Sequence, residues 1–215
     1  MCLPIWISKF FDCTVIKSKI SIRILAVSID DKRALVDLFL TKATRQIDYR
    51  QKIVEFCNKN SDKTDPEITF TDKGLLYKSD YHSLTHAAMI SFVCVKSSRM
   101  LQDITFETQK RWIKLGLDQV GYILKNNYLI GYGNKDISVQ PNHRASACPA
   151  ALGSACGNPW RDSSKPNPNK LFGAIVGGPD AFDQFVDDRK NVNTNGVGLD
   201  SNAAVSGLIA SLYFE

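Results

Sequence analysis

The residue pattern of the chain changes at Asn126, and this change limits the fold more than any other feature. Before it, four segments repeat apolar residues at helical spacing, whereas after it the chain is rich in glycine, proline and asparagine as far as residue 198. The helical segments span residues 32–41, 48–59, 84–96 and 105–125, and a fifth, rich in small apolar residues, spans 201–212. The pattern predicts a mainly helical fold with a long loop region, and loops of this length are usually functional.

The segment at residues 105–125 is the clearest of these helices, because its apolar and aromatic residues keep helical spacing throughout. Asp103 or Thr105 is expected to cap its N-terminus. The segment at 84–96 is apolar on most sides, which predicts a buried helix.

Composition excludes several classes of protein. The chain has 215 residues, enough for one domain or a large piece of one, and its hydrophobic fraction of 44% and charged fraction of 23% are those of a folded protein. No stretch approaches the ~18 apolar residues of a membrane span. Most of the net charge of +5 lies in residues 1–50, where the basic residues are spaced rather than clustered. We therefore expect neither a membrane protein nor a nucleic-acid-binding protein.

The six cysteines do not have the spacing of metal ligands. Cys148 and Cys156 are close enough in the chain to form a disulfide in an oxidising compartment. The others are interpreted as buried thiols: Cys2, Cys13, Cys57 and Cys94.

Several short motifs follow one another along the chain. They are SIDDK at 28–32, TDKGLLY at 71–77, YG at 132–133, PNHRAS at 141–146, PNPNKLFGAIVGGPD at 166–180, DDR at 187–189 and NA at 202–203. In this order and spacing they resemble glycoside hydrolase family 9, the inverting endoglucanases that hydrolyse internal β-1,4-glucosidic bonds of cellulose. The loop motifs resemble the C-terminal active-site loops of that family, most strongly at 166–180. The resemblance covers residues 28–215 and leaves residues 1–27 as a leader that it does not place.

The resemblance implies an (α/α)6 barrel of the six-hairpin type. Family catalytic domains are longer than this chain, and they carry the catalytic aspartate pair and most of a calcium site upstream of the matching region. We therefore expect a truncated, partial barrel with no metal site and no cofactor. Half a barrel exposes the apolar inner faces of its helices, so either a partner chain or collapse into a smaller bundle is needed to cover them.

The position of the catalytic acid follows from two spacings. Inverting hydrolysis needs a carboxylic acid that protonates the leaving oxygen and a second carboxylate, ~6.5–9.5 Å away, that activates water. The family places its acid, a glutamate, seven residues after the arginine of DDR and six before the asparagine of NA. Counted from Arg189 and from Asn202, both spacings lead to Gly196, which has no proton to donate. Asp187 of the same motif is retained, and Asp200 is the nearest carboxylate after Gly196.

The histidine motif of the family is also changed. The family reads PHHR, and its first histidine contacts the substrate. Aligned on Pro141 and Arg144, that position is Asn142, and His143 takes the second place. Asn142 can still hydrogen-bond a sugar hydroxyl, and we expect His143 and Arg144 to contact substrate. A histidine packed in a loop beside Arg144 is the other interpretation of His143.

Three further side chains complete the expected substrate contacts. Where the family reads WGSLR, Tyr81 replaces the tryptophan and His82 replaces the glycine. Tyr81 can stack on a glucose face, whereas His82 is expected to be packed rather than to act as a ligand. Trp160 is either a sugar platform or a loop anchor, and Arg189 either orients a sugar or pairs with a neighbouring aspartate.

The sequence as a whole predicts an endoglucanase-like protein that is inactive by itself, with β-1,4-glucan or cello-oligosaccharide as its partner. The alternatives are a glycan-binding protein without catalysis and a gene fragment without function. The resemblance implies secretion, although residues 1–24 are not a convincing signal peptide, because Lys9 and Asp12 interrupt the apolar stretch.

Overall fold

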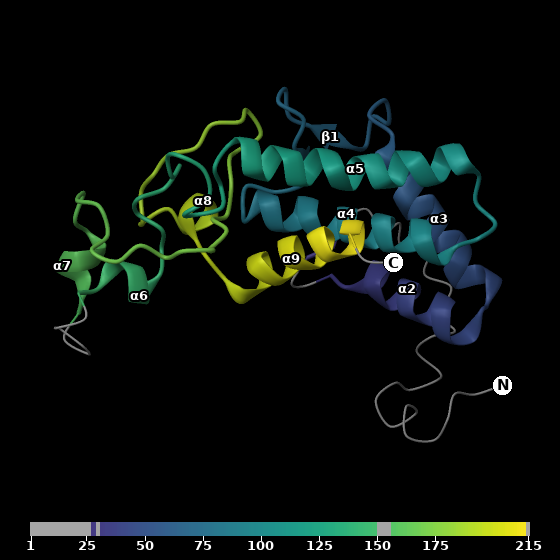
Figure 1. Ribbon diagram of the computed structural model, residues 1–215, viewed down its shortest axis with the longest axis horizontal. Helices are drawn as coiled ribbons and strands as arrows, with labels where there is room; N and C mark the ends of the chain where they lie inside the picture. The colour runs from purple at the N-terminus through teal and green to yellow at the C-terminus, as the bar shows by residue number, and fades with distance from the viewer. Residues whose placement is uncertain (1–26, 29–30, 150–155, 214–215) are drawn as a thin grey trace, which may run out of the picture.

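Helices make up most of the described part of the chain, which is residues 27–28, 31–149 and 156–213 of this computed structural model. In chain order the elements are α2 (Arg33–Thr44), α3 (Ile47–Ser61), β1 (Thr69–Phe70), β2 (Leu76–Tyr77), α4 (Ser83–Met100), α5 (Phe106–Lys125), α6 (Arg144–Ala147), α7 (Asn158–Arg161), α8 (Val192–Asn195) and α9 (Leu199–Tyr213). The five predicted helices are confirmed as α2, α3, α4, α5 and α9. Figure 1 shows the loops that carry α6, α7 and α8 gathered at one end of them.

Two helical hairpins, α2–α3 and α4–α5, form the body of the molecule, and α9 packs against α4 and α5. The predicted cap of α5 is confirmed at Thr105, whose side-chain oxygen accepts a hydrogen bond from the backbone N–H of Thr108 at 3.2 Å. α5 approaches both neighbours at Gly116, where a Cβ atom would lie 2.5 Å from Cγ2 of Val95 and 3.2 Å from Cδ1 of Leu208. The lack of a side chain at this position therefore allows the three helices to pack closely.

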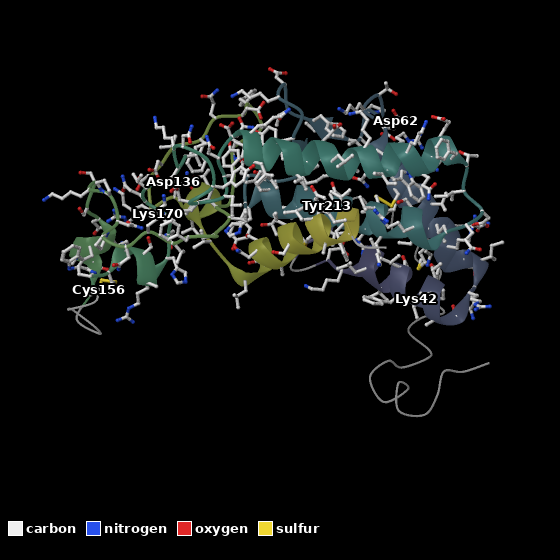
Figure 2. All side chains as sticks on the ribbon, in the orientation of Figure 1. Lys42, Asp62, Asp136, Cys156, Lys170 and Tyr213 are labelled. Atoms are coloured by element: carbon white, nitrogen blue, oxygen red, sulfur yellow. A yellow bond between two sulfur atoms is a disulfide. The ribbon has the colours of Figure 1, made fainter. Side chains whose placement is uncertain are left out.

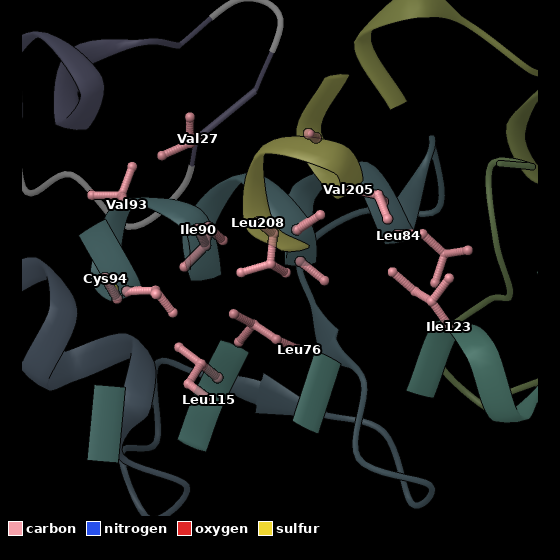
Figure 3. Close-up of a cluster of buried hydrophobic side chains, with 14 of the residues drawn as sticks. Val27, Leu76, Leu84, Ile90, Val93, Cys94, Leu115, Ile123, Val205 and Leu208 are labelled. Atoms are coloured by element: carbon pink, nitrogen blue, oxygen red, sulfur yellow. The ribbon is translucent and has the colours of Figure 1, made fainter. Parts of the chain in front are cut away.

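The core lies where α4, α5 and α9 meet. The predicted burial of the helix at 84–96 is confirmed, because α4 contributes Leu84 and Ile90 with no exposed surface. Figure 3 shows these side chains together with Ile123 of α5 and Leu208 of α9. Buried apolar side chains from distant parts of the chain thus form one contiguous core.

A short antiparallel sheet is attached to α5 by a buried glutamine. In this sheet Thr69 of β1 faces Tyr77 of β2. Gln119 has no exposed surface, and its side-chain oxygen accepts a hydrogen bond from the N–H of Leu76 at 2.9 Å. Its side-chain nitrogen donates to the carbonyl of Gly74 at 3.1 Å. Gln119 therefore fixes the TDKGLLY motif on the body of the molecule.

The structure corrects the interpretation of two cysteines. Cys57 of α3 and Cys94 of α4 have no exposed surface and form a disulfide with a Cα–Cα distance of 5.2 Å, so the prediction of buried thiols is wrong for this pair. The disulfide joins the two helical hairpins. Cys148 and Cys156, which are close enough in the chain to pair, also form a disulfide. Cys2 and Cys13 lie outside the described residues.

An apolar hollow of about 170 Å³ opens between α2, α4 and α9. It is lined by Leu35, Met89, Phe92, Ala203, Ala204 and Gly207. On α2, the side chain of Phe39 is also 68% exposed. This side of the helices therefore presents apolar surface, as expected for part of a barrel.

Of the predicted leader at residues 1–27, only Val27 falls within the described residues. Val27 is fully buried, and its carbonyl oxygen lies 3.1 Å from Nδ1 of His86 on α4. Within the described residues, no helix combines the length and the apolar character needed to cross a membrane.

Candidate functional site

Isolated β-bridges join three loop stretches into one cluster. The bridges pair Leu129 with Ile175, Val176 with Val197 and Asn142 with Gly196. The loops that follow α5, precede α8 and follow α8 therefore lie against one another beyond one end of the helices (Figure 1). In Figure 2 this end carries the ion pair of Asp136 with Lys170, at 2.7 Å, and Cys156 lies at its outer edge.

Asn142 and Gly196, the expected positions of the family's histidine and acid, are neighbours in the structure. Asn142 and Gly196 pair as a parallel bridge, and the N–H of Asn142 donates to the carbonyl of Asn195 at 2.7 Å. The side-chain amide of Asn142 donates to the carbonyl of Arg189. Asn142 is therefore turned toward the DDR motif, and Gly196 is buried beside it.

His82 is the third residue at this point that departs from the family pattern. A Cβ atom on Gly196 would lie 2.5 Å from Nε2 of His82. The prediction that His82 is packed rather than a ligand is confirmed, because it is 6% exposed and its Nδ1 lies 3.3 Å from the hydroxyl of Ser201. Burial lowers the pKa of His82, and the carboxylate of Asp200 opposes this shift only in part.

Asp187, the retained aspartate of the DDR motif, holds a loop in place. Its carboxylate accepts hydrogen bonds from the hydroxyl of Ser138 at 2.7 Å and from the N–H of Val139 at 2.8 Å. A third comes from the N–H of Gln140 at 3.2 Å. The hydroxyl of Ser138 also lies 2.8 Å from Oδ1 of Asn195 on α8. The carboxylate of Asp187 thus fixes the approach to the histidine motif against α8.

Arg189 lies inside the loop cluster rather than on its surface. Its side chain is 2% exposed, and its guanidinium donates to the carbonyls of Trp160 and Lys165. Within the described residues it forms no ion pair with a neighbouring aspartate, so that interpretation is wrong. The adjacency of Asp188 and Arg189 in the chain does not bring their charged groups together. Arg189 instead holds the segment that carries Trp160.

The remaining candidates lie at the surface. Trp160 on α7 is 37% exposed and Tyr81 is 46% exposed. The ring of Tyr81 stacks on that of His82, with centroids 4.3 Å apart and an interplanar angle of 22°. His143 is exposed and caps α6, because its Nδ1 accepts a hydrogen bond from the N–H of Ala145 at 3.2 Å. Arg144 follows it and is also exposed.

Two residues that the motifs did not point to are central to this arrangement. Ser138 and Asn195 connect Asp187 to α8, and both are buried. The only signal for Asn195 in the sequence was its place directly before the position of the acid. Among the described residues, no three histidine, cysteine, aspartate or glutamate side chains gather as ligands of a metal ion.

Comparison with known proteins agrees with this geometry. The sequence pattern of glycosyl hydrolase family 9 matches residues 12–209, beginning earlier than the motifs at residue 28. Endoglucanase 18 of Oryza sativa subsp. japonica is 34% identical over 157 residues, which are 66% of this chain and 30% of that protein. The chain thus spans less than a third of the length of this relative.

Solved structures give the same result. The cellulase Cel9M of C. cellulolyticum in complex with cellobiose is 32% identical, with a TM-score of 0.70 over 87% of this chain and 40% of Cel9M. An endoglucanase from the termite Nasutitermes takasagoensis is 29% identical, with a TM-score of 0.71 over 83% of this chain and 40% of that structure. The predicted fold class is confirmed as part of an (α/α)6 barrel. Because the family pattern matches most of the residues and the fold agrees, the chain belongs to glycosyl hydrolase family 9.

Proposed function

We propose that this chain binds β-1,4-glucan through its loop cluster and does not itself hydrolyse it. Membership of a family of endoglucanases supports the choice of glucan, as does the solved relative Cel9M, which holds cellobiose. The observation that carries the proposal is Gly196, which stands where the family has its proton-donating glutamate.

Among the described residues, the titratable groups near Gly196 do not favour a replacement acid. Its neighbour His82 is buried with a lowered pKa, so its imidazole is neutral at pH 7 and carries no readily donated proton. Asp187 is an acceptor for three donors of the loop at 138–140. Asp200, four residues farther along the chain, has one carboxylate oxygen that is buried without a hydrogen-bond partner among the described residues.

The binding surface in this proposal consists of exposed side chains of the loop cluster together with Tyr81, whose neighbour His82 donates a backbone hydrogen bond to Asn193 of α8. Tyr81 and Trp160 offer aromatic faces to glucose rings, while His143 and Arg144 offer polar groups to sugar hydroxyls. Arg189 acts indirectly, by holding the segment of Trp160 through its carbonyl. Asn142 is engaged with the carbonyl of Arg189 and contributes mainly to the shape of the loops.

Two measurements on the purified chain test the proposal. Reducing-end release from a soluble β-1,4-glucan is expected to equal that of a heat-denatured control, because loss of general acid catalysis alone slows a reaction about 10²- to 10⁴-fold. Titration with cellohexaose is expected to show binding, which Tyr81→Ala and Trp160→Ala each weaken about 2- to 10-fold through the lost aromatic contact. Phe106→Ala is the matched control, because this ring is 65% exposed at the start of α5, away from the loop cluster (Figure 1).

The alternatives predict different results. Release well above the control would identify an active endoglucanase in which another carboxylate serves as the acid. Neither release nor binding would overturn the proposal and leave the interpretation of a gene fragment. Equal weakening by Phe106→Ala would mean that the aromatic residues of the loop cluster are not the binding surface.

The same proposal includes secretion of the protein and the packing of further helices on its apolar side. Two disulfides, Cys57–Cys94 and Cys148–Cys156, are typical of an oxidising compartment and support secretion. The apolar hollow between α2, α4 and α9 supports additional helices of a barrel packed on this side, from this protein or from a partner chain.

A further inference from the structure

We propose that His82 has taken over the space of the missing acid and now supports the sugar platform of Tyr81, so that the glucan site is built for binding only. This inference rests on the proposed function. Three of the residues that depart from the family pattern, His82, Asn142 and Gly196, meet at one point of the structure, although they come from three separate segments.

The first argument is volume. A Cβ atom on Gly196 would lie 2.5 Å from Nε2 of His82, which is closer than real carbon and nitrogen atoms approach without a bond. It would also lie 2.4 Å from the backbone carbonyl oxygen of Val192, so the turn of α8 crowds the same position. Any side chain at position 196, including a glutamate, therefore requires the imidazole of His82 to move.

The second argument is that this imidazole cannot move easily. His82 is 6% exposed, its Nδ1 lies 3.3 Å from the hydroxyl of Ser201, and its backbone N–H donates to the carbonyl of Asn193 at 3.2 Å. The hydroxyl of Ser201 in turn lies 2.7 Å from that of Thr85. The ring is thus held by Ser201 of α9, which Thr85 of α4 fixes in turn, while the backbone of His82 is bound to α8. Nε2, the atom that faces Gly196, has no hydrogen-bond partner among the described residues.

The third argument is the backbone. His82 has a φ of 50°, in the left-handed region that favours glycine, and the family pattern has glycine here. A histidine in this conformation is strained, so its ring must form contacts that offset the strain. Compared with the family pattern, this chain has glycine in place of a side chain at position 196 and a side chain in place of glycine at position 82.

The fourth argument is the role of the ring. The imidazole stacks on Tyr81 at a centroid distance of 4.3 Å, which leaves Tyr81 46% exposed on its outer side. A ring fixed from behind loses little conformational freedom when a sugar stacks on its open face. His82 therefore acts as a positioning residue for Tyr81.

A double-mutant cycle tests the shared space without any ligand. Gly196→Ala is expected to lower the Tm of the otherwise unchanged chain, and at least about 2 °C of that loss is expected to be recovered when the same change is made together with His82→Gly. A residual loss remains, because the carbonyl of Val192 is still close. Folding of Gly196→Ala only in the His82→Gly background would support the proposal equally. The same loss in both backgrounds would overturn it.

Gly116→Ala is the matched control for this cycle. A Cβ atom there would also lie 2.5 Å from a side-chain atom, Cγ2 of Val95, but in the helical core. Its effect on Tm is expected to be the same with and without His82→Gly. Coupling of His82→Gly to Gly116→Ala would mean that the variant disturbs the whole fold, and the proposal would fall.

Cellohexaose binding tests the support of Tyr81. His82→Asn keeps a residue that tolerates the left-handed conformation but removes the stacked ring, and it is expected to weaken binding about 2- to 10-fold. Unchanged affinity in His82→Asn would overturn the supporting role. If the effects of Gly196→Ala and His82→Gly on Tm are coupled but the chain binds no glucan, the proposed function is overturned and the exchange of space is left intact. Additive effects of the two substitutions on Tm, in a chain that binds glucan, would overturn the exchange of space and leave the proposed function intact.

Discussion

Alanine at both Cys57 and Cys94 is expected to lower the free energy of unfolding by about 4 kcal/mol, because the disulfide closes a loop between residues 37 apart in sequence. For a chain of this size the Tm then falls by about 8–16 °C. The cross-link joins α3 to α4 and so ties one helical hairpin to the other. Thermal and denaturant unfolding followed by circular dichroism measure the effect.

The second disulfide is the matched control for this prediction. Cys148 and Cys156 are separated by 8 residues, so their replacement by alanine is expected to cost about 2.5 kcal/mol at most on the same reasoning. Cys57→Ala alone should be nearly as destabilising as the double variant, since either change removes the cross-link. A wild-type chain whose Tm is unaffected by reductant would contradict a stabilising role for Cys57–Cys94.

The helices were predictable because their signals are local. Apolar residues at helical spacing fix α2 to α5 and α9 within a few residues, and the cap at Thr105 follows from the residue type at the helix start. The disulfide between Cys57 and Cys94 was not predictable in the same way. Periodicity indicates that each cysteine is on a buried face, but not that the two faces oppose each other.

The candidate site also has parts that the sequence predicts and parts that only the folded structure shows. Two spacings both lead to Gly196 as the expected position of the acid, and this prediction uses only positions in the chain. The contacts of Gly196 with Asn142 and His82 require the loops to be folded, because these residues come from separate segments. Arg189 shows the limit most clearly: the two residues before it in the chain are acidic, yet its guanidinium donates to the carbonyls of Trp160 and Lys165.

Asp183, in the loop between the motifs at 166–180 and 187–189, is bound to the TDKGLLY motif, and its replacement is expected to have the other large effect on stability. It is 7% exposed and accepts hydrogen bonds from the hydroxyl of Thr71 at 2.7 Å and from the N–H of Lys73 at 2.8 Å, both in the TDKGLLY motif. The hydroxyl of Tyr122 on α5 donates a third. Asp183→Ala leaves these donors buried without an acceptor and is expected to cost about 3–5 kcal/mol.

Asp183→Asn separates the charge from the geometry, because asparagine tolerates the φ of 58° found at this position. Its amide accepts fewer of the three hydrogen bonds, so a loss of about 2 kcal/mol is expected at pH 7. Asp188→Asn is the matched control: this carboxylate accepts a hydrogen bond from the N–H of Lys190, and the change is expected to cost less than about 1 kcal/mol.

The dependence on pH distinguishes the charge of Asp183 from simple packing. Burial opposes the charged form, but the hydrogen bonds from Tyr122, Lys73 and Thr71 outweigh it and hold the pKa of Asp183 below its usual range. A carboxyl group whose pKa is lower in the folded state stabilises the fold above its unfolded-state pKa of about 3.9, and this contribution is lost as the pH falls through the folded-state value. The difference in unfolding free energy between wild type and Asp183→Asn should therefore be constant from pH 7 to about pH 5 and shrink below about pH 4. A difference that stays the same down to pH 2 would show that the carboxylate charge of Asp183 does not hold its loop against the TDKGLLY motif.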